Sequence, residues 1–220
     1  MKLPKGTRCK EYSLGKKGIF IPRAEIRRYG PGEMVEKTVP GDFLLTHGDT
    51  GQSRLIRLGQ RMRYQGRDEK FAHWTHAALF VDSDGMLVEA VEPGVQERNA
   101  RVYRDTEYHV VHLLDVSPED REHAVAFAMH CLHDSYGFLT DISLFFTLLF
   151  ATKIFFGVDG QMICSGLVAR ALERTGAIFQ YDSWHLLPAD LAEAFNVTPE
   201  PGASIGTIPA PHLGVTRRSQ

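Results

Sequence analysis

Two short apolar segments joined by a four-residue polar turn constrain the fold of this chain more than any other feature. Residues 73–81 and 86–91 are mostly apolar, and the turn between them reads Asp-Ser-Asp-Gly. This pattern predicts two antiparallel strands joined in a β-hairpin. Because side chains alternate between the faces of a strand, we expect His76 and Glu89 to share a face as direct or diagonal neighbours. Glu89 is the only charged residue in its strand, and such a carboxylate usually has a partner.

A cysteine lies at the start of a predicted helix. Apolar residues stand three, four, seven and eight positions after Cys164, which predicts an amphipathic helix that ends near Thr175, followed by Gly176. Cys164 then points with the apolar stripe toward the body of the protein. The N–H groups and the dipole of a helix N-terminus favour a thiolate there. The alternative is a buried structural cysteine, because unpaired cysteine is among the most buried residue types.

Together, Cys164, His76 and Glu89 supply a nucleophile, a base and an orienting carboxylate. Like Cys164, the other two also have ordinary structural interpretations. His76 would be a half-buried imidazole bonded to the backbone, and Glu89 a carboxylate at a strand edge. We take the three residues as the candidate catalytic residues.

The same segments resemble a known family. Residues 75–81, 88–90 and 163–168 are similar to the circularly permuted papain-like cysteine hydrolases, the YaeF/YiiX group in the superfamily of NlpC-type peptidases and lecithin:retinol acyltransferase. In that family the order along the chain is His, an acidic or polar residue, then Cys. Further similarity covers the opening strand, the short helix after it, the aromatic segment before the nucleophile and the turn into the last helix, at residues 41–46, 53–57, 136–138 and 187–191.

The resemblance spans residues 40 to 195 and implies an α+β fold of the permuted papain-like (NlpC) type. A central antiparallel sheet would have the helix that begins at Cys164 packed against it. It implies that Cys164 is the nucleophile, His76 the base and Glu89 the orienting group. We expect the substrate contacts to come from Tyr136, Ser165, Trp74 and Arg54.

Two departures from the family pattern affect the expected substrate. Gly166 stands where members commonly have Glu, and Gly137 where they often have Asp, both near the expected cleft. By family habit the chain is a cysteine amidase or peptidase that cleaves a peptide or a small amidated substrate through an acyl-enzyme. An ester or thioester substrate would make it a lipase, thioesterase or acyltransferase. The competing class is a catalytically idle module that binds a membrane or a partner.

An apolar stretch at residues 142–156 favours an acyl substrate if it walls the cleft. It holds five of the thirteen phenylalanines and one charged residue, Lys153. About 20 residues are needed to span a bilayer, so this stretch is too short. A core helix or a dimer contact is the alternative interpretation.

The net charge of −2 is unevenly distributed, since the first 40 residues hold ten Lys and Arg but four Asp and Glu. We predict a basic N-terminal extension over residues 1–38, with short strands near residues 18–22. The hydrolase domain follows at 39–200 and an irregular tail at 201–220. The basic extension and residues 142–156 could contact a membrane surface, although a solvated surface is the commoner explanation of such a charge distribution. We expect no nucleic-acid partner, and the oligomeric state is left open.

Cysteine and histidine spacing argue against disulfides and metals. Three widely spaced cysteines indicate a reducing compartment. The first residues lack the apolar segment of a secretory signal, which predicts a cytoplasmic location unless export needs no such signal or a leader was removed. Ten histidines include three pairs spaced three apart, but no HExxH or paired CxxC motif accompanies them. We therefore expect neither a metal nor another cofactor.

Overall fold

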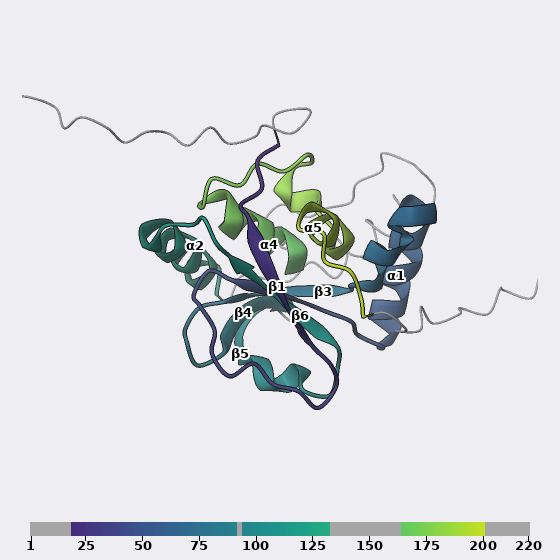
Figure 1. The fold of residues 1–220 in the computed structure, drawn as a ribbon, viewed down its shortest axis with the longest axis horizontal. Helices are drawn as coiled ribbons and strands as arrows, with labels where there is room; N and C mark the ends of the chain where they lie inside the picture. The colour runs from purple at the N-terminus through teal and green to yellow at the C-terminus, as the bar shows by residue number, and fades with distance from the viewer. Residues whose placement is uncertain (1–18, 92–93, 133–163, 201–220) are drawn as a thin grey trace, which may run out of the picture.

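A six-stranded antiparallel sheet with helices packed on one face forms the centre of the molecule, as Figure 1 shows. The computed structural model describes residues 19–91, 94–132 and 164–200. The strand order is β1-β6-β2-β3-β4-β5. The strands are β1 (Ala24–Tyr29), β2 (Phe43–Thr46), β3 (His76–Phe80), β4 (Met86–Val91), β5 (Gly94–Asn99) and β6 (Tyr108–Leu113). The expected α+β class and central antiparallel sheet are confirmed.

The structure describes four α-helices and three short 3₁₀ helices around the sheet. They are α1 (Gly51–Arg63), α2 (Pro118–His130), α4 (Cys164–Glu173) and α5 (Pro188–Ala194), with short 3₁₀ helices η1 (Gly66–His73), η2 (Ala100–Tyr103) and η3 (Ser183–His185). Helix α4 packs on β3 and β4 and is flanked by α2 and α5. No helix in the described ranges is long and apolar enough to cross a membrane.

The predicted hairpin is confirmed. Strands β3 and β4 are antiparallel neighbours in which Leu79 pairs with Val88 and Phe80 with Leu87. Gly85 ends the turn with φ near +89°, a conformation that favours glycine. Continuing this register makes His76 and Glu89 diagonal neighbours on one face of the sheet. Since the paired residues lie at the turn end of the hairpin, His76 and Glu89 lie toward its open end.

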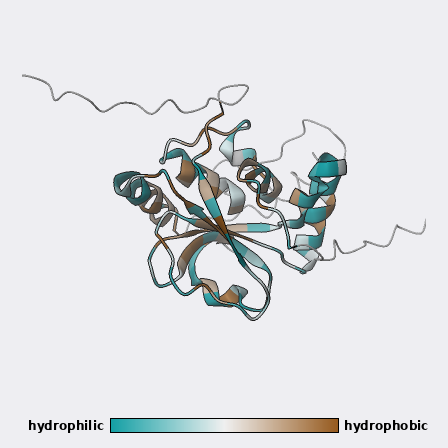
Figure 2. Cartoon of the chain, in the orientation of Figure 1, coloured by the Kyte–Doolittle hydropathy of each residue, from teal (hydrophilic) through white to brown (hydrophobic). Residues whose placement is uncertain are grey.

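Helix α4 is also where the sequence predicts it, and it is central to the core. Leu167, Val168 and Leu172 are completely buried, and Cys164 is 6% exposed. After the helix ends at Glu173, Gly176 takes a positive φ of 84°, and its N–H donates to the carbonyl of Glu173. Figure 2 shows apolar residues concentrated in the sheet and in α4 and α5, whereas α1 is largely hydrophilic. The catalytic candidate on α4 is therefore held by the main core.

The chain before residue 39 contributes a strand to this sheet. Strand β1 pairs with β6 along its whole length, from Ala24 opposite Leu113 to Tyr29 opposite Tyr108. Of the short strands expected near residues 18–22, the structure shows an isolated bridge between Phe20 and Ile178. The range predicted as an N-terminal extension thus includes an edge strand of the domain. Residues 1–18 and the predicted tail at 201–220 lie outside the described residues.

Candidate active site

Three elements bring the predicted catalytic residues together. Cys164 is the first residue of α4, His76 the first residue of β3, and Glu89 lies within β4. Nε2 of His76 lies 2.7 Å from Oε2 of Glu89. Cys164 interacts with the same imidazole both electrostatically and through a hydrogen bond. Because Glu89 occupies Nε2, the nitrogen that remains for the sulfur of Cys164 is Nδ1.

The charges at this site favour an imidazolium. Burial of His76 disfavours its charged form, but the charge and hydrogen bond of Cys164, together with those of Glu89, outweigh this effect. The net result raises the pKa of His76 to about 10. At neutral pH the ring is then doubly protonated, with one N–H directed to a carboxylate and the other to a sulfur. An ion pair of this kind is what a reactive cysteine requires.

Glu89 is a completely buried carboxylate with two further partners. The hydroxyl of Tyr103 donates to Oε2, the oxygen that also faces His76. Nη1 of Arg98 lies 3.2 Å from Oε1. Burial would raise the pKa of Glu89, but the bonds from His76 and Tyr103 and the charge of Arg98 lower it overall. The carboxylate therefore remains ionised inside the protein.

Sequence reasoning did not find Tyr103 and Arg98. Tyr103 is one of seven tyrosines and ends a short 3₁₀ helix, while Arg98 lies in strand β5 amid other polar residues. A weak signal was available, because Arg98 lies opposite Leu87 and is a diagonal neighbour of Glu89 on the same face of the sheet. Without the register of β4 against β5, however, it could not be used.

The expected substrate contacts have other roles in the structure. Trp74 is completely buried and donates from Nε1 to the carbonyl of Val197 at 2.9 Å. Ser165 is also completely buried, and its hydroxyl donates to the carbonyl of Leu186 at 2.5 Å. These bonds tie the core to the C-terminal segment and leave no face of either side chain open to a substrate. Tyr136 lies outside the described residues.

Arg54 lies on the exposed surface of α1. Its Nε is 3.2 Å from Oδ1 of Asp49, in the loop that leads into the helix. This loop is anchored close to the triad, because the N–H of Gly48 donates to Oγ1 of Thr75, the neighbour of His76. The structure does not bring Arg54 into contact with Cys164, His76 or Glu89.

A second polar cluster lies where β2 ends and β3 and β6 begin, beside the C-terminal end of the described residues. It is formed by His47, His73, Glu107 and His109. Nε2 of His73 donates to Glu107 at 2.9 Å, and Nε2 of His109 lies 3.4 Å from the other carboxylate oxygen. Nδ1 of His47 donates to the carbonyl of His73, while its Nε2 accepts from Arg57 at 2.7 Å. Within residues 19–91, 94–132 and 164–200, no group of three or more His, Cys, Asp or Glu side chains has the arrangement needed to hold a metal ion.

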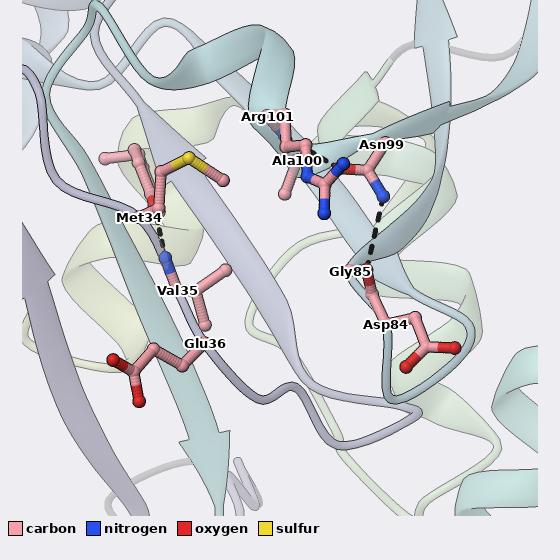
Figure 3. Close-up of a pocket in the computed structure, with 9 residues that line it drawn as sticks. Met34, Val35, Glu36, Asp84, Gly85, Asn99, Ala100 and Arg101 are labelled. Atoms are coloured by element: carbon pink, nitrogen blue, oxygen red, sulfur yellow. Dashed lines mark hydrogen bonds between the residues drawn. The ribbon is translucent and has the colours of Figure 1, made fainter.

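A cavity of about 340 Å³ lies between the loop after β1, the β3–β4 turn and η2. Figure 3 shows Met34, Val35 and Glu36 on one side of it and Asp84, Asn99 and Arg101 on the other. None of the predicted site residues lines this cavity. Its relation to the triad is indirect, because η2 forms part of its wall and also carries Tyr103.

Comparison with known proteins does not add a family to this picture. The chain matches no protein-family model, and a search of curated proteins finds no match. The fold and the site define an α+β protein in which a cysteine at a helix start meets a histidine and a buried glutamate.

Proposed function

We propose that this protein is a cysteine hydrolase of the circularly permuted papain-like kind, which cleaves an amide through Cys164, His76 and Glu89. One observation supports this most strongly. Glu89 engages Nε2 of His76, and Cys164, at the start of α4, interacts with the same ring. Nucleophile, base and orienting carboxylate thus stand in the order that covalent catalysis needs. The family resemblance of residues 40 to 195 supports an amide, from a peptide or a small amidated molecule, as the substrate.

In the first half of the reaction, Cys164 and His76 start as a thiolate–imidazolium pair, because Nδ1 of His76 already holds the proton of the thiol. The thiolate attacks the amide carbonyl carbon, and the carbonyl π electrons move to oxygen. Backbone N–H groups at the start of α4 can donate to this oxyanion. Nδ1–H then protonates the departing nitrogen, the C–N bond breaks, and the amine leaves a thioester on Cys164.

In the second half, water replaces the amine. Neutral His76 takes a proton from the water at Nδ1 while the oxygen attacks the thioester carbonyl. Collapse of the tetrahedral intermediate breaks the C–S bond, releases the carboxylic acid and restores the thiolate–imidazolium pair. Throughout, Glu89 holds Nε2–H and stabilises the positive charge on the ring.

The proposal is tested by the rate of iodoacetamide labelling at Cys164 as a function of pH, read by mass spectrometry. An ordinary thiol with a pKa near 8.5 is only about 0.3% ionised at pH 6. We expect rapid labelling of Cys164 at pH 6 and a loss of about 100-fold in His76→Ala, because the thiolate loses its cationic partner.

Cys131 provides the internal control. It is also buried, at 3% exposed, and lies in the same core cluster, but outside the triad. Its labelling should be slow at pH 6 and unaffected by His76→Ala. If Cys164 follows the pH profile of an ordinary thiol, or labels no faster than Cys131, the hydrolase proposal is wrong.

A further inference from the structure

The carboxylate of Glu89 is held from three directions, and two of them lie outside the triad. Tyr103 donates to the same oxygen that faces His76, and Arg98 faces the other oxygen at 3.2 Å. The ring of Tyr103 also lies beside the ring of His76, with centroids 6.0 Å apart. Tyr103 therefore contacts both His76 and the group that orients it.

A completely buried carboxylate needs such partners to keep its charge. Removing an ionised group from water is costly unless other charges and hydrogen bonds replace the lost solvation. Burial and the negative charge of Glu89 raise the pKa of Tyr103, so its hydroxyl keeps its proton and remains a donor. Arg98 brings the positive charge, and Tyr103 fixes which oxygen points at the imidazole.

The hairpin that carries His76 and Glu89 also positions Tyr103. Helix η2 begins at Ala100, whose N–H donates to the carbonyl of Gly85 in the β3–β4 turn. Asn99 links the same elements, because it accepts from the N–H of Arg101 and donates to the carbonyl of Asp84. These bonds attach η2, and with it Tyr103, to the turn between the two strands that carry His76 and Glu89.

We propose that Tyr103 and Arg98 are positioning residues of the active site, which keep Glu89 ionised and aimed at Nε2 of His76 and so maintain the thiolate of Cys164. This inference rests on the proposed hydrolase function. It extends the triad to a five-residue network from α4, β3, β4, β5 and η2. Neither added residue needs to touch the substrate.

The test measures the rate of iodoacetamide labelling at Cys164 against pH in wild type, Tyr103→Phe and Arg98→Gln. The quantity compared is the midpoint, the pH at which this rate is half its maximum. Tyr103→Phe removes one hydroxyl and keeps the ring, so the midpoint should rise by about one pH unit, a tenfold slower reaction at lower pH. Arg98→Gln should raise it in the same direction, and Arg98→Lys should restore part of the shift because it restores the charge. Tyr29→Phe is the matched control, since the ring of Tyr29 stacks on Tyr108, outside this network.

A purely structural role would alter stability but leave the pH midpoint unchanged. Unchanged midpoints in both Tyr103→Phe and Arg98→Gln, alongside a wild-type midpoint that depends on His76, would overturn this inference alone. A wild-type Cys164 that behaves as an ordinary thiol would instead overturn the proposed function, and the inference with it. If either variant does not fold, as judged by circular dichroism, the other still decides the question.

Discussion

The orientation of the His76 ring decides which nitrogen can exchange a proton with Cys164. Nε2 is directed to Glu89 at 2.7 Å, which assigns Nδ1 to the sulfur. Cys164 and Glu89 both raise the pKa of His76, which reaches about 10 in spite of burial. We therefore expect the imidazole to stay protonated through pH 8 in histidine NMR spectra. Cys164→Ala removes one of the two anionic partners and should lower the pKa of His76 by about one unit or more.

The signal of His76 is assigned by its absence from the spectrum of the His76→Ala variant. His123, an exposed residue of α2, is the control, because it has no contact with the triad among the described interactions and should not respond to Cys164→Ala. A wild-type His76 pKa near 6.5, or a His76 pKa that does not change in Cys164→Ala, would contradict the ion pair.

Sequence reasoning recovered part of the site at the level of single residues. The pairing of His76 with Glu89 could be predicted because strand alternation and a short turn fix it locally. Trp74 and Ser165 were predicted to face the substrate, yet both are buried and bonded to backbone carbonyls. Their side chains suit a cleft or a core equally well, and only tertiary packing separates the two. Tyr103 reaches Glu89 through the way η2 folds back on the hairpin, which no local pattern encodes.

At the scale of single elements, helix α2 shows how far local signals reach. Ser117 precedes Pro118 and two acidic residues, which predicts a helix start. The structure confirms it, since the side chain of Ser117 accepts from the N–H of Asp120 at 3.1 Å.

We expect Ser117→Ala to lower the free energy of unfolding by about 1 kcal/mol, because that N–H loses its partner. Urea denaturation measures the change, and Ser83→Ala, at an exposed position in the β3–β4 turn, should leave stability nearly unchanged. Equal effects of the two substitutions would contradict the cap.

Strand β1 shows where local signals stop. Its six residues include Glu25, Arg27 and Arg28, and its burial is only partial, as is usual for an edge strand. What makes it a strand is its pairing with β6, whose residues lie 79 to 89 positions later in the chain. Composition alone therefore predicts a charged extension there, whereas the mostly apolar, valine-containing β6 could be predicted as a strand from its own residues.

At the scale of the whole molecule, the second histidine cluster joins the segments that precede β3 and β6 to the C-terminal end of the described residues. Glu107 precedes β6, binds His73 before β3, and accepts from the N–H of Glu200 near the C-terminal end of the described residues. Trp74, next to His73, holds the same segment through Val197. Burial would raise the pKa of Glu107, but the bonds from His109 and His73 lower it well below its usual range. The cluster therefore stabilises the contact between the C-terminal end of the described residues and the sheet only while the carboxylate of Glu107 is ionised.

His47 makes the stability of the fold sensitive to mild acid. Burial, aided by the charges of His73 and Arg57, lowers the pKa of His47, and its Nε2 must stay unprotonated to accept from Arg57. A group whose pKa is lower in the folded state binds its proton more readily when unfolded, so stability falls as pH decreases below about 6.5. Glu107 acts in the same direction below about pH 4.5. We expect the free energy of unfolding, measured in urea, to decline from pH 6 to pH 5, where the opposite contribution of His76, whose pKa is raised, is nearly complete. His47→Gln should flatten that decline. His123→Gln, on the exposed face of α2, should keep the wild-type slope. A His47→Gln slope equal to that of wild type would show that the acid sensitivity arises elsewhere, since His47 is the group that must lose its bond to Arg57 on protonation.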